Sequence, residues 1–166
     1  RLSLVGSEMC IRDSNPTSTV TPASEIDPWV RSKPDNTLFI ADEAYAEYVS
    51  DPNFKSMANL IQDGLDNVVL LKTFSKLYAM AGMRVGFAVG APAIIKMMKD
   101  QVAGEKLNYP GVTAALVSLD DEPFQEYSRA STLESRKILA SCFDKLGVKY
   151  LPSSTNFMFF ELNEPI

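Results

Sequence analysis

The sequence contains no histidine among its 166 residues, and this absence excludes several kinds of chemistry. Without an imidazole there is no Ser-His-Asp triad, no Cys-His dyad and no histidine-ligated metal site, so no metal centre is expected. Acid–base chemistry near neutral pH must therefore use a lysine, a carboxylate, a tyrosine or a bound cofactor. The two cysteines, Cys10 and Cys142, are too few for a disulfide framework or a metal knuckle.

Basic charge and long apolar runs are also scarce. The chain carries 16 Lys and Arg against 21 Asp and Glu, a net charge of −5, which argues against binding to nucleic acid or to an anionic membrane surface. No apolar run approaches the roughly 20 residues that span a bilayer, and the N-terminus lacks the residue order of a signal peptide. We therefore expect a cytoplasmic protein with neither nucleic-acid nor membrane partners.

Strand and helix patterns alternate along the chain, whose length predicts about one domain. Short apolar runs predict strands, the first three of them buried, at 38–41, 68–71, 85–89, 150–151 and 157–160. Helical spacing and capping residues predict helices at 23–31, 54–65, 92–102 and 120–146. In the last helix, Leu139, Phe143 and Leu146 are expected to form an inner face, and Gly147 to end it. This alternation predicts an α/β fold with a mainly parallel sheet.

Polar residues stand where the predicted strands end. The first strand runs into Asp42 and Tyr45, the second into Thr73-Phe74-Ser75-Lys76, and Arg84 precedes the third. In α/β folds the chemistry gathers at the carboxyl ends of the strands. Each residue alone has a structural alternative: Asp42 as a turn cap, Lys76 as a solvated lysine, or Arg84 in a surface ion pair. Together they predict one polar site at the sheet edge.

The order and spacing of these motifs resemble the fold-type I pyridoxal-phosphate enzymes, specifically the class I/II aminotransferases and most of all their histidinol-phosphate aminotransferase branch. The resemblance covers residues 15–166, and it implies a three-layer sandwich with the start of a small α+β domain, pyridoxal 5'-phosphate as cofactor and a homodimer. The matching motifs are Asn15-Pro16-Thr17, Asp42-Glu43-Ala44-Tyr45, Thr73-Phe74-Ser75-Lys76, Ala81-Gly82-Met83-Arg84-Val85-Gly86-Phe87 and Ser154-Thr155-Asn156-Phe157.

The resemblance also implies the two central roles of the site. Asp42 would pair with the protonated ring nitrogen of the cofactor, which must stay protonated for the ring to act as an electron sink. Lys76 would form the Schiff base with the cofactor aldehyde and, once released by the substrate, would move the proton between Cα and C4′. Lys76 is therefore the expected catalytic residue.

The remaining site residues are expected to hold the cofactor and the substrate. By the same resemblance, Tyr45 and Asn15 would hydrogen-bond the phenolic oxygen of the cofactor. The hydroxyls of Ser75 and Thr73 and the guanidinium of Arg84 would bind its phosphate. One further residue, Asn156, would contact the substrate carboxylate. Its structural alternative is an amide at the edge of a strand that pairs with the backbone.

The chain departs from the family pattern near its N-terminus. Family members usually continue Asn-Pro-Thr with glycine, whereas this chain has Ser18, which tolerates a positive φ poorly. Residues 1–14 are interpreted as a foreign leader, with a native strand and turn as the alternative. Residues 15–130 are expected to form part of the cofactor-binding large domain, and residues 131–166 the connecting helix and the start of the small domain. The resemblance also implies a glycine-rich phosphate cup upstream and an arginine clamp for the substrate carboxylate downstream, which this chain does not contain, so it is expected to be a fragment with little or no turnover of its own.

The function expected of the intact protein is transamination of an amino acid or amino-alcohol phosphate, with 2-oxoglutarate as the 2-oxo acid acceptor. One alternative keeps the cofactor but decarboxylates the substrate, as in threonine-phosphate decarboxylase-like enzymes. Another is a noncatalytic α/β nucleotide-binding or interaction domain, although the sequence contains neither G-x-G-x-x-G nor G-x-x-x-x-G-K-[ST].

Overall fold

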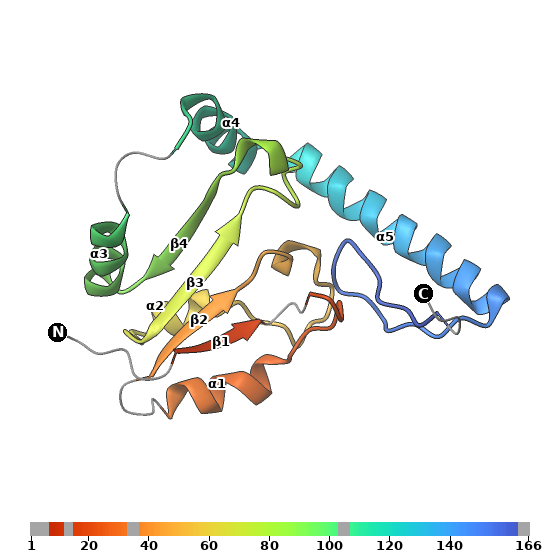
Figure 1. Ribbon diagram of the computed structural model, residues 1–166, viewed down its shortest axis with the longest axis horizontal. Helices are drawn as coiled ribbons and strands as arrows, with labels where there is room; N and C mark the ends of the chain where they lie inside the picture. Colours follow the sequence, from red (N-terminus) through yellow and green to blue (C-terminus); the bar gives the residue numbers. More distant parts are fainter. Residues whose placement is uncertain (1–6, 12–14, 33–36, 103–106, 163–166) are drawn as a thin grey trace.

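The computed structural model describes residues 7–11, 15–32, 37–102 and 107–162, which are built around one four-stranded sheet (Figure 1). The pairs β1–β2 and β2–β3 are parallel, whereas β3–β4 is antiparallel. The prediction of an α/β fold with a mainly parallel sheet is therefore confirmed. In spatial order the strands are β1 (Ser7–Ile11), β2 (Leu38–Asp42), β3 (Val68–Thr73) and β4 (Gly86–Gly90).

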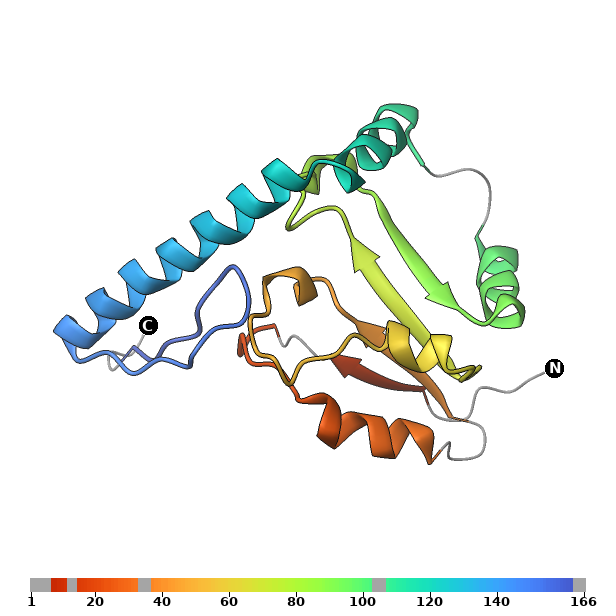
Figure 2. The same cartoon turned by 180° about the vertical axis from the view of Figure 1, so that it is seen from behind.

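Two helices supply the core on one face of the sheet. Helix α1 (Ala23–Arg31) lies between β1 and β2 in the chain, and α2 (Ala58–Gln62), seen in front of the sheet in Figure 2, lies between β2 and β3. The β2 side chains alternate between buried and half-buried, because only one face of the strand packs against these helices. The largest buried cluster comprises Ile26, Val30, Phe39, Ala41, Met57, Leu60, Val68 and Leu70.

The second half of the chain is helical and extends away from the sheet. After β4 come α3 (Pro92–Gln101), α4 (Tyr109–Leu119) and α5 (Glu122–Leu146), and residues 148–162 return alongside α5 (Figures 1 and 2). The Asp121 side chain caps α5 by accepting a hydrogen bond from the Phe124 amide at 3.1 Å. Gly147 ends the helix at φ +66°, a left-handed conformation that glycine adopts without steric cost. Both ends of α5 are as predicted.

The helix predicted over 54–65 is wrong in extent, since α2 covers only Ala58–Gln62. Its start is displaced because the Met57 amide donates to the Glu43 carboxylate at 2.8 Å instead of to a carbonyl one turn earlier. The chain then turns at Gly64, whose φ is +91°. A contact from another element therefore sets the beginning of this helix.

Three further predictions are wrong in burial or in strand content. The apolar face of α5 is not an inner face, since Leu139 and Leu146 are 43% and 69% exposed and only Phe143 packs, on the rings of Tyr150 and Phe160. Strand β4 is largely exposed rather than buried, with Phe87 and Val89 46% and 38% exposed, and it lies at the edge of the sheet. Instead of strands at 150–151 and 157–160 there is one antiparallel bridge, Tyr150–Phe160.

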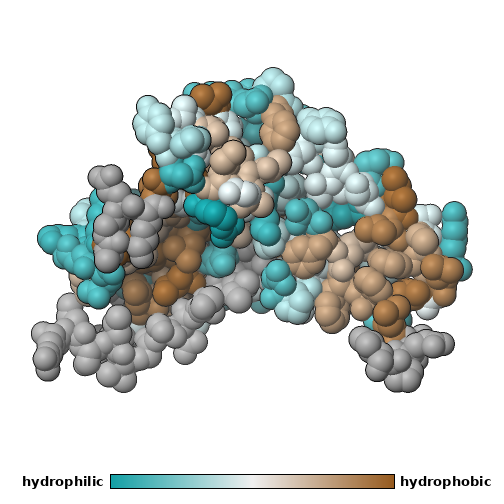
Figure 3. Space-filling view, turned by 45° about the horizontal axis from the view of Figure 1, so that its top comes forward, coloured by the Kyte–Doolittle hydropathy of each residue, from teal (hydrophilic) through white to brown (hydrophobic). Residues whose placement is uncertain are grey.

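Hydrophobic side chains consequently reach the surface at both ends of the face shown in Figure 3. Strand β4 and helices α3 and α4 all carry exposed hydrophobic side chains, such as Val89, Met98 and Leu119. Such patches are larger than isolated exposed residues, and they mark surfaces suited to further packing. Among the most exposed are Phe87, Met97, Leu107, Tyr109, Leu116, Val117, Tyr127, Ile138, Leu146 and Leu162.

The turn that follows Asn15 places a serine in the left-handed region of the backbone map, where a non-glycine residue is strained. Ser18 is fully buried with φ +61°, and its carbonyl accepts a hydrogen bond from the Ser154 amide at 2.8 Å. A non-glycine residue in this region is strained by roughly 1–2 kcal/mol.

Residues 7–11 form the edge strand β1. The foreign origin of residues 1–14 stays a prediction, since a strand of any origin can pair with a free sheet edge.

Candidate active site

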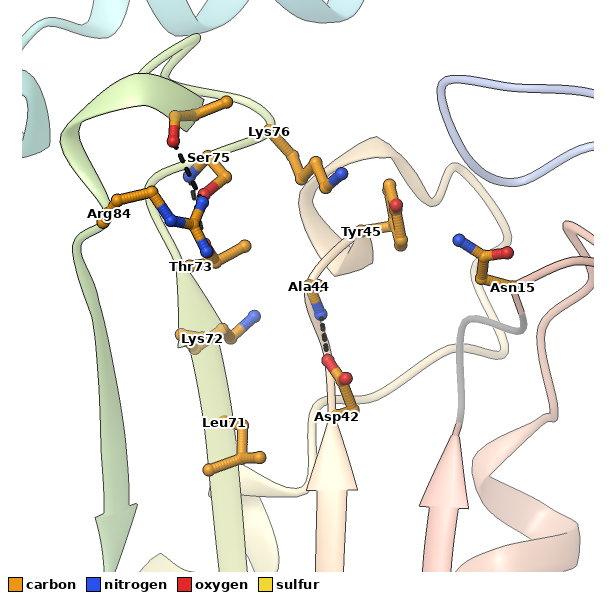
Figure 4. Close-up of a pocket in the computed structure, with 11 residues that line it drawn as sticks. Asn15, Asp42, Ala44, Tyr45, Leu71, Lys72, Thr73, Ser75, Lys76 and Arg84 are labelled. Atoms are coloured by element: carbon orange, nitrogen blue, oxygen red, sulfur yellow. Dashed lines mark hydrogen bonds between the residues drawn. The ribbon is translucent and has the colours of Figure 1, made fainter.

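A cavity of about 450 Å³ opens at the carboxyl ends of β2 and β3 (Figure 4). This is the edge of a parallel sheet at which ligands bind, and the volume lies within the roughly 300–1,000 Å³ typical of small-molecule sites. The lining brings together seven residues predicted from the sequence, namely Asn15, Asp42, Tyr45, Thr73, Ser75, Lys76 and Arg84. It is completed by Ala44, Leu71, Lys72 and Ala81.

Asp42 supplies a carboxylate at the tip of β2 (Figure 4). The residue is half-buried, and its Oδ1 accepts a hydrogen bond from the Ala44 amide at 3.1 Å. This bond orients the side chain at the point where the strand ends. A partly desolvated carboxylate favours a neighbouring positive charge, so Asp42 is suited to pair with a protonated ring nitrogen.

Arg84, Ser75 and Thr73 form a group of donors on another side of the cavity. Arg84 follows the 3-10 helix η2 (Ala81–Met83) at φ +54°, and its Nη1 donates to the Ala81 carbonyl at 2.9 Å. The Ser75 amide donates to Thr73 Oγ1 at 3.1 Å, which shapes the turn after β3. Figure 4 shows the guanidinium beside both hydroxyl residues. A guanidinium with adjacent hydroxyls is a donor set suited to a phosphate dianion.

Lys76 and Tyr45 face each other across the cavity (Figure 4). The Lys76 Nζ lies over the Tyr45 ring, 5.0 Å from its centroid, within the range of a cation–π contact. The Tyr45 ring is only 7% exposed and packs edge-on against Phe157, with centroids 5.3 Å apart. Asn15 is exposed at the rim, on the loop before α1. The amine is therefore presented to the cavity from above an aromatic surface.

Lys72 is a lining residue that the motifs did not single out. Its Nζ lies 2.8 Å from Glu47 Oε1 and 3.4 Å from Glu43 Oε2. Burial lowers the pKa of Lys72, but the two carboxylates outweigh burial, so its pKa is raised above the ordinary value. One signal was present in the sequence, because a lysine that ends an otherwise apolar strand, Val68-Val69-Leu70-Leu71-Lys72, needs a carboxylate partner when it is buried.

Comparison with known proteins assigns these features to a family. The family described as aminotransferase class I and II matches residues 13–166. The chain belongs to this family. The cofactor of these enzymes is pyridoxal phosphate, and their fold-type I architecture is the one that the solved structures share with this chain.

Individual relatives of this aminotransferase chain lie in the histidinol-phosphate branch. It is 38% identical over 154 residues to the histidinol-phosphate aminotransferase of Symbiobacterium thermophilum, covering 93% of this chain and 42% of the relative. A crystal structure ascribed to a histidinol-phosphate aminotransferase of Erwinia carotovora is 51% identical, with a TM-score of 0.94 over 96% of this chain and 46% of that one. The Sinorhizobium meliloti enzyme, solved with pyridoxal-5'-phosphate, is 26% identical, with a TM-score of 0.87 over 95% and 42%.

The aminotransferase chain spans about two-fifths of the length of the curated relatives that it matches. Its predicted division at residues 130 and 131 falls inside α5, which runs unbroken from Glu122 to Leu146. The division into two domains stays a prediction.

None of the helices in the described ranges combines the length and apolar composition that crossing a membrane requires.

Asn156 is the candidate residue that the structure places away from the cavity lining. Its side chain is exposed, whereas Thr155 before it is fully buried and Phe157 after it packs on Tyr45. The loop is held by Arg136 of α5, whose Nη1 donates to the Ser153 carbonyl at 2.6 Å and whose pKa is lowered by burial. Asn156 as a substrate contact of the aminotransferase therefore stays a prediction.

Proposed function

We propose that the intact protein is a pyridoxal-phosphate-dependent aminotransferase that transfers the amino group of an amino acid or amino-alcohol phosphate to 2-oxoglutarate. The observation that carries this proposal is the convergence of a carboxylate, the amine of Lys76 and a guanidinium on one cavity. These groups are Asp42, Lys76 and Arg84, which come from three separate segments of the chain. Family membership gives this convergence its chemical meaning.

The charges around the cavity fit the cofactor at each of its polar positions. Asp42 would pair with the protonated ring nitrogen, since its half-buried carboxylate favours a neighbouring cation. Arg84, Ser75 and Thr73 would hold the phosphate through charge-assisted hydrogen bonds. Lys76 Nζ, above the Tyr45 ring, would bond the aldehyde carbon. The volume of about 450 Å³ is adequate for a ligand of this class.

In this proposal, the residues of this chain bind the cofactor, orient its ring and move a proton. Bound pyridoxal phosphate supplies an electron sink for the substrate Cα. Lys76 would hold the cofactor and, when released, would take and return the proton at Cα. Tyr45 and Asn15 donate hydrogen bonds to the cofactor's phenolic oxygen and thereby orient the ring. Asn156 is proposed to contact the substrate carboxylate.

The proposed substrate is an amino acid or amino-alcohol phosphate, as for the histidinol-phosphate aminotransferases. Support comes from the curated relatives, which are histidinol-phosphate aminotransferases at 34% and 38% identity. A homodimer and a cytoplasmic location belong to the same proposal. The exposed apolar side chains of α4, such as Leu116 and Val117 at 64% and 68% exposure, are consistent with further packing in the assembled enzyme.

The direct test is chemical capture of the cofactor. The purified chain is incubated with pyridoxal phosphate, reduced with borohydride and analysed by peptide mass mapping, with Lys76→Ala as the control. We expect a phosphopyridoxyl group on the Lys76 peptide of the wild type and none at that position in the variant. Labelling spread evenly over exposed lysines such as Lys96 and Lys149 would contradict the proposal for this chain.

Two other functions are separated by their products and ligands. Decarboxylation uses the same cofactor and differs in which Cα bond breaks, so product analysis of the full-length enzyme distinguishes glutamate from carbon dioxide. A noncatalytic nucleotide-binding domain would bind ATP or NAD, and this binding would survive replacement of Lys76. The donor set of the described cavity matches the cofactor without a nucleotide-binding loop, which argues against the nucleotide-binding domain, whereas the decarboxylase is separated only by its products.

A further inference from the structure

Two carboxylates on either side of Tyr45 contact one ammonium group. Glu43 lies two residues before Tyr45 and Glu47 two residues after it. Lys72 Nζ, on β3, lies 3.4 Å from Glu43 Oε2 and 2.8 Å from Glu47 Oε1. The segment 43–47 is therefore bracketed at both ends by one side chain of the neighbouring strand.

This bracket is anchored in the protein interior. Glu43 is fully buried, and its two oxygens also accept hydrogen bonds from Ser56 Oγ at 2.7 Å and the Met57 amide at 2.8 Å. The side chains of Lys72 and Glu47 are 16% and 25% exposed. Charge interactions at such depth are stronger than at an open surface. The ammonium has three donors and can serve both carboxylates at once.

The bracketed residue, Tyr45, immediately precedes the 3-10 helix η1 (Ala46–Tyr48). Its ring is 7% exposed and lies beneath Lys76 Nζ, 5.0 Å from the ammonium. A displacement of segment 43–47 would therefore move the aromatic surface on which the Lys76 amine rests.

We propose that Lys72 is a positioning residue of this site, which ties both flanks of Tyr45 to β3 and thereby holds the Tyr45 ring against the Lys76 amine. Lys72 acts through Tyr45, and no contact between Lys72 and the substrate is needed. The effect of Lys72 on cofactor binding rests on the proposed function, whereas its effect on the positions of Tyr45 and Lys76 does not depend on any cofactor.

Lysine NMR of the chain tests this effect without any cofactor. In protein labelled with ¹³C-lysine, the Lys76 ε-CH₂ protons should be shifted upfield by the Tyr45 ring current, and they are assigned by their loss in Lys76→Ala. Lys72→Met should move them toward the positions of exposed lysines, and Lys72→Arg should restore the shift. Lys96→Met, which breaks the exposed Lys96–Asp100 pair at 2.9 Å, is the matched control and should leave them in place.

An unmoved Lys76 resonance in a folded Lys72→Met chain would overturn the proposal, as would the absence of any upfield shift in the wild type. If Lys72→Met does not fold, Glu47→Gln replaces it, because this change removes the charge of the 2.8 Å partner and leaves the buried Glu43 in place. A partial movement of the Lys76 resonance is then expected. A resonance at the wild-type position in Glu47→Gln would refute the role of the bracket.

A double-mutant cycle on cofactor binding adds a second readout. Lys72→Met should weaken pyridoxal phosphate binding roughly tenfold, and it should cause no further loss in a Tyr45→Leu background, because the two residues act as one unit. Losses that add in full would contradict action through Tyr45. If the wild type captures no cofactor at Lys76, the proposed function fails for this chain, and the lysine spectra alone decide the role of Lys72.

Discussion

Replacement of Glu43, a fully buried carboxylate, measures how strongly the site is held to the core. In Glu43→Ala, the Met57 amide and Ser56 Oγ lose an acceptor at 2.8 Å and 2.7 Å, and Lys72 retains Glu47. Hydrogen bonds to a charged acceptor contribute about 1.5–3 kcal/mol each. The variant also avoids the desolvation cost of the carboxylate, so we expect a net loss of about 3 kcal/mol in the free energy of unfolding, near the lower end for a broken buried pair.

Urea unfolding followed by far-UV circular dichroism at neutral pH measures this loss. Glu43→Gln keeps the shape and one acceptor, so a loss of about half that size is expected. The control is Glu134→Ala on the exposed side of α5, where a surface change should stay within about 0.5 kcal/mol. If Glu43→Ala and Glu134→Ala give the same unfolding midpoint, the buried carboxylate does not hold the site and the reasoning is refuted.

Three further predictions concern the sheet, a helix cap and pH. A Cβ at Gly86 would lie 2.7 Å from the Lys72 carbonyl oxygen, so Gly86→Ala should lower the free energy of unfolding by roughly 1–3 kcal/mol in urea titrations; an unchanged midpoint would contradict this close approach. Asp121→Ala removes the cap on the Phe124 amide and should lower stability by about 1 kcal/mol, with Asp121→Asn retaining most of it by the same assay. Burial lowers the pKa of Lys72, but Glu47 and Glu43 raise it by more, so its pKa in the folded chain lies above the ordinary value of 10.5. The stabilisation of the fold by these ion pairs is therefore complete below pH 10.5 and is lost as the pH rises through the folded pKa. The unfolding free energy should therefore fall more steeply above about pH 10.5 for the wild type than for Lys72→Met, and equal slopes would refute the ion pairs.

Most of the cavity lining could be predicted from the sequence because its residues follow short, buried strands. Asp42 and Thr73 end β2 and β3, and both strands begin with a continuous apolar run of four residues that is easily recognised. Parallel pairing then brings their carboxyl ends to one edge, whatever the details of the loops. Asp42, Tyr45, Thr73, Ser75 and Lys76 therefore line one cavity, whereas Asn15, which also lines it, was expected only from the family resemblance.

Features that depend on contacts between distant segments could not be predicted in the same way. The start of α2 is set by Glu43, a buried residue that precedes the helix by many positions and competes for the Met57 amide. The period of Leu139 and Leu146 shows that one face of α5 is apolar, but a period carries no information about what covers that face. Lys72 shows the same limit, because its partners lie on another segment of the chain.

The hydrogen bond from the Ser154 amide to the Ser18 carbonyl has a consequence for the order of folding. It joins the two ends of the described chain, and contacts between such distant residues form slowly because a long loop must close first. During synthesis the sheet and its first two helices emerge long before Ser154 does. We therefore expect the turn that carries Asn15 to reach its final shape last, after the rest of the cavity wall has formed.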